Sequence, residues 1–362
     1  MSSGGDPSSI TQPIQTVGKF SSTRRDASTP RTHRAQEPTL LHHRRDGPRS
    51  VPPGVEYHRV LAGEKRRIGR GVLAVVLLLA GMVVFPTVIG RGAALIDVQL
   101  GNNPPILPGG TDYTPLYNAA SMFSLALLIP WSMCIQRWLY GVRGASLHSV
   151  VSRFRFDVFG RALLFLGPVL VIVLMFGALL TPGEETYWSH ADLIGVVLGV
   201  LLLTPLQTAG EEYGVRGLLF RVAGSWARGP RAGLVVGVLV TSVLFTAVHG
   251  ATDPYIVVWY LVWWAGAALI TWRTGGLEVA IVIHAVINTL SIAVAVLMRA
   301  DLAAALGDRS EGAVTAYQLV PTLTLVVITA VVWWYTRRTG PALTPARTPT
   351  GSFAGPGQVR PG

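Results

Sequence analysis

Residues 193–212 read LIGVVLGVLLLTPLQTAGEE, an uncharged run of eighteen residues that ends in two glutamates. A run of about 20 mostly apolar residues is long enough to cross the hydrocarbon core of a bilayer. A backbone in lipid has to satisfy its own hydrogen bonds, and a single segment does so as an α-helix. This stretch therefore predicts a membrane-spanning helix that carries two carboxylates at one end.

Seven more apolar runs lie between a polar N-terminal tail and a polar C-terminal tail. The eight runs are 71–90, 117–136, 162–181, 193–212, 233–250, 255–272, 278–298 and 317–336. Half of the 362 residues are hydrophobic and 14% are charged, whereas soluble domains carry about 25% charged residues. We therefore expect an all-α polytopic membrane protein, a bundle of about eight transmembrane helices within residues 69–338.

The two tails differ sharply in composition from this apolar region. Residues 1–68 and 339–362 are rich in Pro, Gly, Thr and Arg and contain few large apolar residues. Such segments cannot bury enough apolar surface to offset the entropy lost on ordering, so both tails are predicted to be disordered. No apolar stretch opens the chain, so we expect no cleavable signal peptide.

The net charge of +11 is distributed as a membrane topology signal. Residues 1–70 hold thirteen Lys and Arg against six Asp and Glu, and further Arg residues lie in connections 137–161 and 213–232. The alternate connections are neutral or acidic. Basic connections stay in the cytoplasm, so both tails are expected there. The expected partner is the lipid bilayer rather than nucleic acid, and the Arg-, Ala- and Gly-rich tails have a bacterial character.

Ionisable residues within apolar spans are energetically costly, which makes them functional candidates. Glu212 and Arg216 are four residues apart, so they share a helix face and can pair. Glu211 is turned about 100° from Glu212, so its carboxylate is left for another partner. A polar helix end explains this segment equally well when it is taken alone. Arg221 lies outside the pairing, and Arg221→Ala is expected to be mild.

Two more spans carry a histidine at or near membrane depth. His249 follows Phe245 by four residues at the end of the fifth run, where it could simply cap a helix. His284 and Asn288 lie one turn apart on one face of the seventh run. Polar side chains in apolar surroundings need partners, and a hydrogen bond between helices would satisfy them.

The three motifs occur in a fixed order on three helices. They are Glu-Glu-x-x-x-Arg at 211–216, Phe-x-x-x-His at 245–249 and His-x-x-x-Asn at 284–288. This ordered set resembles the signature of the CPBP family, whose members include CAAX prenyl proteases and bacteriocin-processing (Abi-type) peptidases. The resemblance covers about residues 195–295. It implies a helical intramembrane peptidase with a polar cavity that opens toward the cytoplasm.

The resemblance also implies a role for each motif residue. Glu211 would be the general base that activates water, and His249 would hold that water or bind a metal. His284 and Asn288 would stabilise the oxyanion of the tetrahedral intermediate. Glu212, with its arginine partner, would support the site as an ion pair. The expected substrate is a membrane-associated peptide or protein.

Three questions stay open at this stage. Glu211, His249 and His284 could form a three-ligand zinc site with an open position, or glutamate could act without a metal. A non-catalytic immunity or scaffold protein and a proton-coupled transporter are alternative functions. Simple helical hairpins also place His249 near the outer face and His284 about 10 Å from the inner one. We therefore expect a local departure from simple hairpins: the fourth run breaks or continues past residue 212 at Pro205 and the glycines that follow it. The fifth run could also tilt or sit deeper at Gly237 and Gly250.

Overall fold

The computed structural model describes residues 50–180, 185–307 and 309–346, and this part of the chain is helical apart from isolated β-bridges. Eight helical segments are long and apolar enough to cross a membrane. They are α1 (Ile68–Gln99), α2–α3 (Pro115–Ala126 and Leu128–Tyr140), α4 (Phe156–Leu180), α5–η3–α6 (His190–Glu212, Tyr213–Leu219 and Phe220–Gly224), α7 (Pro230–Val248), α8 (Pro254–Thr274), α9 (Glu278–Leu297) and η4–α11 (Ala316–Gln318 and Leu319–Thr336). The prediction of an all-α bundle with eight spans is confirmed.

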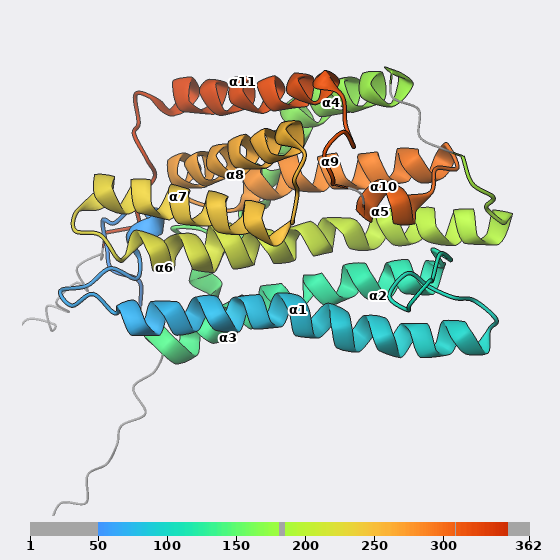
Figure 1. The fold of residues 1–362 in the computed structure, drawn as a ribbon. Helices are drawn as coiled ribbons and strands as arrows, with labels where there is room; N and C mark the ends of the chain where they lie inside the picture. Colours follow the sequence, from blue (N-terminus) through green and yellow to red (C-terminus); the bar gives the residue numbers. More distant parts are fainter. Residues whose placement is uncertain (1–49, 181–184, 308, 347–362) are drawn as a thin grey trace, which may run out of the picture. The chain divides into compact units, whose positions relative to one another are not determined.

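The helices lie side by side with their long axes roughly aligned (Figure 1). Helix α1 packs on α2 and α3, and α5 packs between α2 and α9. Helix α9 also contacts α4 and α8, and α11 covers α8. In the most apolar 18-residue stretch of α9, 61% is buried inside the protein, whereas the corresponding stretches of α1, α4 and α11 are 17% buried. Helix α9, which carries His284, is therefore the central helix of the bundle.

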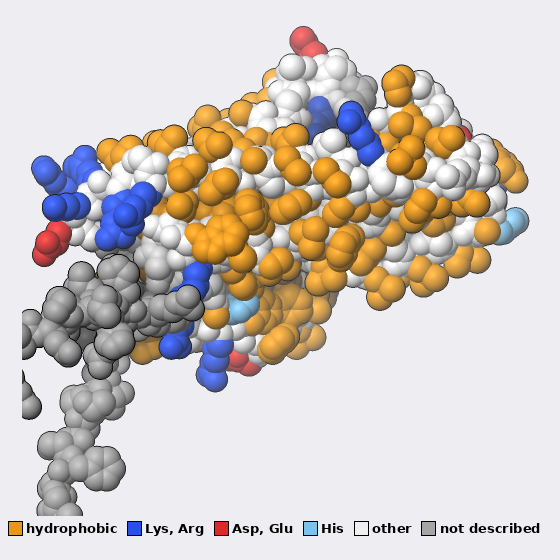
Figure 2. Space-filling model, turned by 90° about the horizontal axis from the view of Figure 1, so that it is seen from below, with side chains coloured by type: hydrophobic (Ala, Val, Ile, Leu, Met, Phe, Trp, Pro, Cys, Tyr) orange, Lys and Arg blue, Asp and Glu red, His pale blue; other side chains and the backbone are white. Residues whose placement is uncertain are grey.

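The outer surface of the bundle is apolar along most of its length. Figure 2 shows hydrophobic side chains over the middle of one face and Lys and Arg side chains gathered mainly toward one end. Large apolar side chains such as Val83, Phe165 and Leu202 are more than 60% exposed. In water such a surface would be unfavourable, whereas lipid tails cover it without cost. The surface is that of a multi-pass membrane protein.

The structure describes only part of the two tails that were predicted to be disordered, because residues 1–49 and 347–362 lie outside the described residues. Residues 50–67 and 339–346 are described, and there the prediction is wrong. Tyr57 in η1 (Tyr57–Arg59) is fully buried. The Thr344 N–H donates to the Val55 carbonyl, and the Val55 N–H donates to the Thr344 hydroxyl. The few large apolar residues of these segments suffice because they dock onto an existing bundle.

The turn between α8 and α9 depends on one glycine. Gly275 ends α8 with φ of 68°, a left-handed conformation that favours residues without a Cβ. Its backbone N–H bonds to the Thr271 carbonyl, which closes the helix. The turn lets α9 begin only three residues later, at Glu278, so that α8 and α9 form a tight hairpin.

Candidate active site

Glu211, His249, His284 and Asn288 line one cavity of about 680 Å³. They come from three elements, α5, the end of α7 and α9. Gln207, one turn before Glu211, lines the same cavity. A volume of this size lies within the usual range for ligand-binding pockets. The structure therefore brings the polar residues of the three motifs to a common space.

The two histidines reach the same cavity because the helices begin at different depths. Of the expected departures, the fourth run continues past residue 212 and does not break there. The fourth span continues through η3 to Gly224, twelve residues beyond its predicted end at Glu212. Gly217 in η3 lies beside Leu277, just before α9 begins. Six residues, about 9 Å, separate Gly217 from Glu211, and His284 lies about 10 Å into α9, so the two side chains reach the same level.

The same argument places His249. Gly237 of α7 packs on the ring of Phe220, and His249 lies twelve residues farther along, about 18 Å. Phe220 is nine residues, about 13 Å, from Glu211 on the opposite helix. His249 therefore lies within about one helical turn of the level of Glu211. Helices α7 and α9 differ in where they start, which the apolar pattern alone did not reveal.

Four ionisable groups form a buried network at this level. His284 Nδ1 donates to Glu212 Oε1 at 2.7 Å, and its Nε2 lies 3.4 Å from Glu211 Oε2. Arg216 Nε donates to Glu212 Oε2 at 2.6 Å, and its NH2 group donates to Glu212 Oε1. Glu212 and Arg216 are fully buried, and Glu211 and His284 are less than 10% exposed. The sequence prediction that Glu212 pairs with Arg216 while Glu211 faces another group agrees with this geometry.

The network contains more acidic than basic side chains. Two carboxylates and one guanidinium leave one formal negative charge that the ion pair does not compensate, and a buried net charge is strongly unfavourable. The His284 imidazole lies between the two carboxylates, with Nδ1 on Glu212 and Nε2 toward Glu211. The geometry thus supports a carboxylate base with an adjacent group that can take or return a proton.

Aromatic rings enclose the ion pair. The Arg216 guanidinium lies over the ring of Trp264 at 4.6 Å and that of Phe245 at 5.3 Å. The Trp264 ring also lies 5.5 Å from His249 and 5.6 Å from His284. Cations are attracted to the faces of aromatic rings, and more strongly where water is excluded. The phenylalanine of the second motif therefore has a structural role in holding the arginine of the first.

His249 is held in one tautomer by its own helix. The Phe245 carbonyl, 2.7 Å from His249 Nδ1, can only accept, so Nδ1 carries a proton and donates. Burial lowers the pKa of His249 to about 4, so the ring is neutral near pH 7 and Nε2 keeps a lone pair. The Tyr260 ring lies tilted beside the His249 ring with their centroids 4.5 Å apart, and Arg309 donates to the His249 carbonyl at 2.9 Å. His249 can therefore accept a hydrogen bond from a water molecule.

The zinc alternative rests on Glu211, His249 and His284. Within residues 50–180, 185–307 and 309–346, no group of three or more His, Cys, Asp or Glu side chains is placed to hold a metal ion. The Nδ1 atoms of His249 and His284 contact a carbonyl and a carboxylate, an arrangement that metal-ligating histidines also show. The zinc alternative therefore stays a prediction, and no step below passes through a metal.

The direction of the cavity differs from what the family resemblance implied. Its lining includes Met298, Ala300 and Arg309, which lie beyond the end of α9 in a connection expected outside the cytoplasm. No residue of the basic connections 137–161 or 213–232 lines it. The expected opening on the side of the basic connections is therefore wrong for this structure. The cavity extends toward the opposite end of the bundle.

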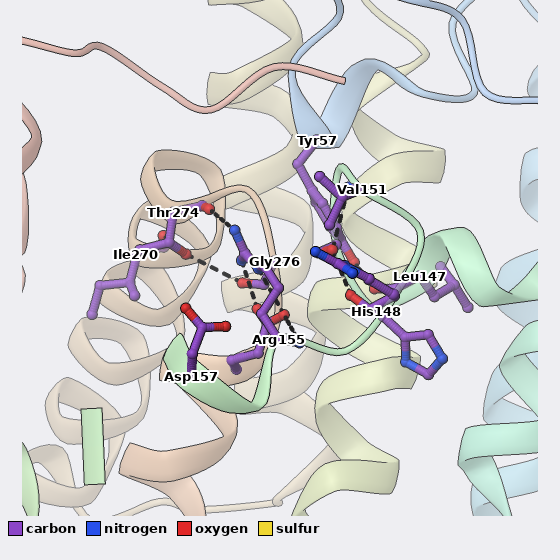
Figure 3. Close-up of polar contacts among 12 residues, drawn as sticks. Tyr57, Leu147, His148, Val151, Arg155, Asp157, Ile270, Thr274 and Gly276 are labelled. Atoms are coloured by element: carbon purple, nitrogen blue, oxygen red, sulfur yellow. Dashed lines mark hydrogen bonds and ion pairs between the residues drawn. The ribbon is translucent and has the colours of Figure 1, made fainter. Parts of the chain in front are cut away.

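Sequence reasoning missed a second polar cluster at the basic end. Arg155, taken only as a topology signal, forms a bidentate ion pair with fully buried Glu278 and donates to the Thr274 carbonyl at 3.0 Å (Figure 3). Tyr57 donates to the Leu147 carbonyl at 2.5 Å. The available signal was Glu278 itself, an ionisable residue at the first position of a predicted span.

Arg221 also belongs to this end and is not peripheral. It is fully buried, donates to Ser146 and Gln136, and lies over the Tyr57 ring at 4.0 Å. The expectation that Arg221→Ala would be mild is therefore wrong. The residue was misplaced because the fourth span was expected to end at Glu212, which left Arg221 in a solvated connection.

Comparison with known proteins gives one result. Residues 190–290 match the family model described as Type II CAAX prenyl endopeptidase Rce1-like. No curated protein and no solved structure matches the chain. The matched segment contains all three motifs and the helices α5 to α8 with most of α9. The family resemblance predicted from those motifs is confirmed.

Proposed function

We propose that the chain is an intramembrane endopeptidase, and the match of residues 190–290 to the Type II CAAX prenyl endopeptidase Rce1-like family model supports this proposal. Its substrate would be a membrane-associated protein or peptide, and water activated by a glutamate would cleave the bond. The observation that carries the proposal is the convergence of Glu211, His249, His284 and Asn288 on one cavity. A base, a water-binding group and an amide donor in one enclosed space are what amide hydrolysis requires.

Each residue receives a role from its contacts. Glu211, whose carboxylate is oriented by His284 Nε2 at 3.4 Å, takes a proton from water as the water oxygen attacks the scissile carbonyl carbon. His249 Nε2 accepts a hydrogen bond from the other O–H group of that water molecule. The Asn288 amide lines the cavity one turn from His284 and donates to the developing oxyanion. The proton on Glu211 then passes to the leaving amine as the C–N bond breaks.

This assignment changes the role that the resemblance implied for His284. Both of its ring nitrogens face carboxylates, Glu212 at 2.7 Å and Glu211 at 3.4 Å. The ring is therefore better placed to orient Glu211 and to hold its proton than to donate to substrate. Glu212 and Arg216 in turn fix the ring, because a bidentate pair with Arg216 holds the Glu212 carboxylate rigidly.

We propose an orientation for the bundle from its charge. The basic residues outside the buried core, including Arg155, Arg228 and Arg231, cluster at the end where α4, α7 and α9 begin. The positive-inside rule places this end in the cytoplasm. The end that carries Glu185, Asp253 and Arg309 then lies outside the cytoplasm.

The substitution Glu211→Gln tests the function. It keeps the side-chain shape and removes the base, so cleavage of a tagged membrane substrate should fall by two orders of magnitude or more. Glu185→Gln, an exposed carboxylate at the outer end, is the matched control and should leave cleavage unchanged. Full cleavage by Glu211→Gln would favour a non-catalytic scaffold or immunity protein instead.

A further inference from the structure

One end of the cavity is closed by packed side chains. At the basic end, the segment 144–155 folds over η3 and the start of α9. His148 hydrogen bonds with the hydroxyl of Tyr213, the residue that follows the two motif glutamates. Arg155 pairs with Glu278, and Leu147 and Leu277 are fully buried. A substrate arriving from this end would have to displace the segment.

The other end of the cavity leads away from these contacts. Beyond Asn288 its lining continues through Ser291, Ala295 and Met298 along α9. It then reaches Arg309 and Gln318, in the connection between α9 and α11. The walls on the way are mostly apolar and include several tryptophans. The path from the reacting groups to the surface therefore runs through the half of the bundle opposite to the basic connections.

One basic side chain, that of Arg309, lines this part of the cavity. Arg309 is the only Lys or Arg among the described residues that line the cavity, and Glu211 is the only carboxylate. Arg309 donates to the His249 carbonyl at 2.9 Å, so its guanidinium lies next to the proposed water-binding residue. A guanidinium in partly desolvated surroundings is a good binding group for a carboxylate.

We propose that the substrate enters from the end that carries Arg309, and that Arg309 binds a carboxylate of the entering peptide beside the scissile bond. The proposal rests on the peptidase function and deepens it. In the proposed orientation the substrate is an apolar peptide segment presented from outside the cytoplasm. Its carboxylate is an acidic side chain or the carboxyl terminus.

Access can be measured without knowing the substrate. In a Cys134→Ser background, Gln207→Cys places the single thiol inside the cavity, and Ala145→Cys places one on the exposed surface of the basic end. A small membrane-impermeant methanethiosulfonate is applied to spheroplasts and to sealed inverted vesicles. The two thiols should react from opposite sides. Reaction from the same side, or no reaction of Gln207→Cys from either side, would overturn the proposed route.

The charge preference is measured with the same thiol. An anionic sulfonatoethyl reagent and a cationic trimethylammonium reagent are compared at Gln207→Cys. Adding Arg309→Gln should lower the anionic-to-cationic rate ratio by about threefold or more, because one positive charge leaves the path. Arg299→Gln, an exposed arginine at the same end that does not line the cavity, should not change the ratio. An unchanged ratio in Arg309→Gln would overturn the assignment.

Two sources of the carboxylate are separated by protection. An apolar peptide with a free carboxyl terminus, its amide, and the amide with an internal Asp are each added before the anionic reagent. Stronger protection by either acidic form than by the neutral amide supports the proposal and names the source, and equal protection by all three contradicts it. These readouts report access and binding, so loss of the peptidase proposal in the Glu211→Gln test would not be confused with loss of this one.

Discussion

The pair formed by Glu212 and Arg216 gives the sharpest prediction, because the chain contains a matched pair with the opposite exposure. Arg161 and Asp157 are also four residues apart on a helix and form an ion pair at 2.7 Å. Their side chains are 67% and 71% exposed, whereas those of Arg216 and Glu212 are both 0% exposed. Spacing and chemistry are the same, so any difference in their effects comes from burial.

The magnitude follows from that difference. Removing one partner of a buried ion pair leaves an uncompensated charge and destabilises by about 3–5 kcal/mol. Arg216→Met also removes the guanidinium from the rings of Phe245 and Trp264 while it keeps most of the side-chain volume. An exposed pair at this spacing contributes only about 0.3–0.5 kcal/mol. Arg216→Met should therefore be strongly destabilising and Arg161→Met nearly silent.

The assay is equilibrium unfolding in detergent, with tryptophan fluorescence as the readout. The double variant Glu212→Gln/Arg216→Met should recover part of the loss, because it removes the charge that the single variant strands. The coupling energy should be about 2 kcal/mol or more. Equal shifts for Arg216→Met and Arg161→Met, or no recovery in the double variant, would refute the reasoning that the ion pair is fixed by its burial.

Three further predictions follow from the described contacts. Gly210→Ala should reduce stability and cleavage together, because its Cβ would collide with the Leu125 carbonyl, and Gly92→Ala, which meets no atom, should be silent in the same assays. Arg221→Ala should destabilise by about 2–4 kcal/mol through the loss of buried hydrogen bonds. Burial lowers the pKa of His58 from 6.5 to about 4. The free energy of unfolding should therefore be at its full value above pH 6.5 and fall by about 3 kcal/mol as the pH drops to 4. In acid unfolding titrations, His58→Gln should reduce this loss.

The number of spans was predictable because the membrane imposes a length on each of them. Each of the eight predicted runs overlaps one observed segment, and 278–298 differs from Glu278–Leu297 by one residue. The largest error is at the fourth span, which ends at Gly224 instead of Glu212. Hydropathy treats Glu211, Glu212 and Arg216 as a boundary, since it cannot register that Glu212 pairs with Arg216 inside the bundle and that Glu211 faces His284.

The ordered motifs predicted which residues share the site, but not how they contact one another. No spacing rule joins Glu212 to His284, because their helices are related only by packing. Helix depth decides that contact, and depth is set by where α9 begins, after the tight turn at Gly275. The direction of the cavity was missed for the same reason. It depends on the loop around Arg155, whose ion pair with Glu278 appears in the sequence as two isolated charges.

The extension of α5 through η3 and α6 explains how a bilayer protein can hold the proposed base, Glu211, at this depth. Glu211 lies thirteen residues, about 20 Å, from Gly224, so the motif falls within the helix and not at its end. At a helix end, water would screen Glu212 and Arg216, and their pairing would be weak. Within the helix the pair is dry and rigid, and it anchors His284, which in turn orients Glu211. The π-helical turns of η3, from Tyr213 to Leu219, begin directly after the two glutamates and contain Arg216. Such segments are frequent at functional sites, and here one continues the helix past its charged residues without interrupting it.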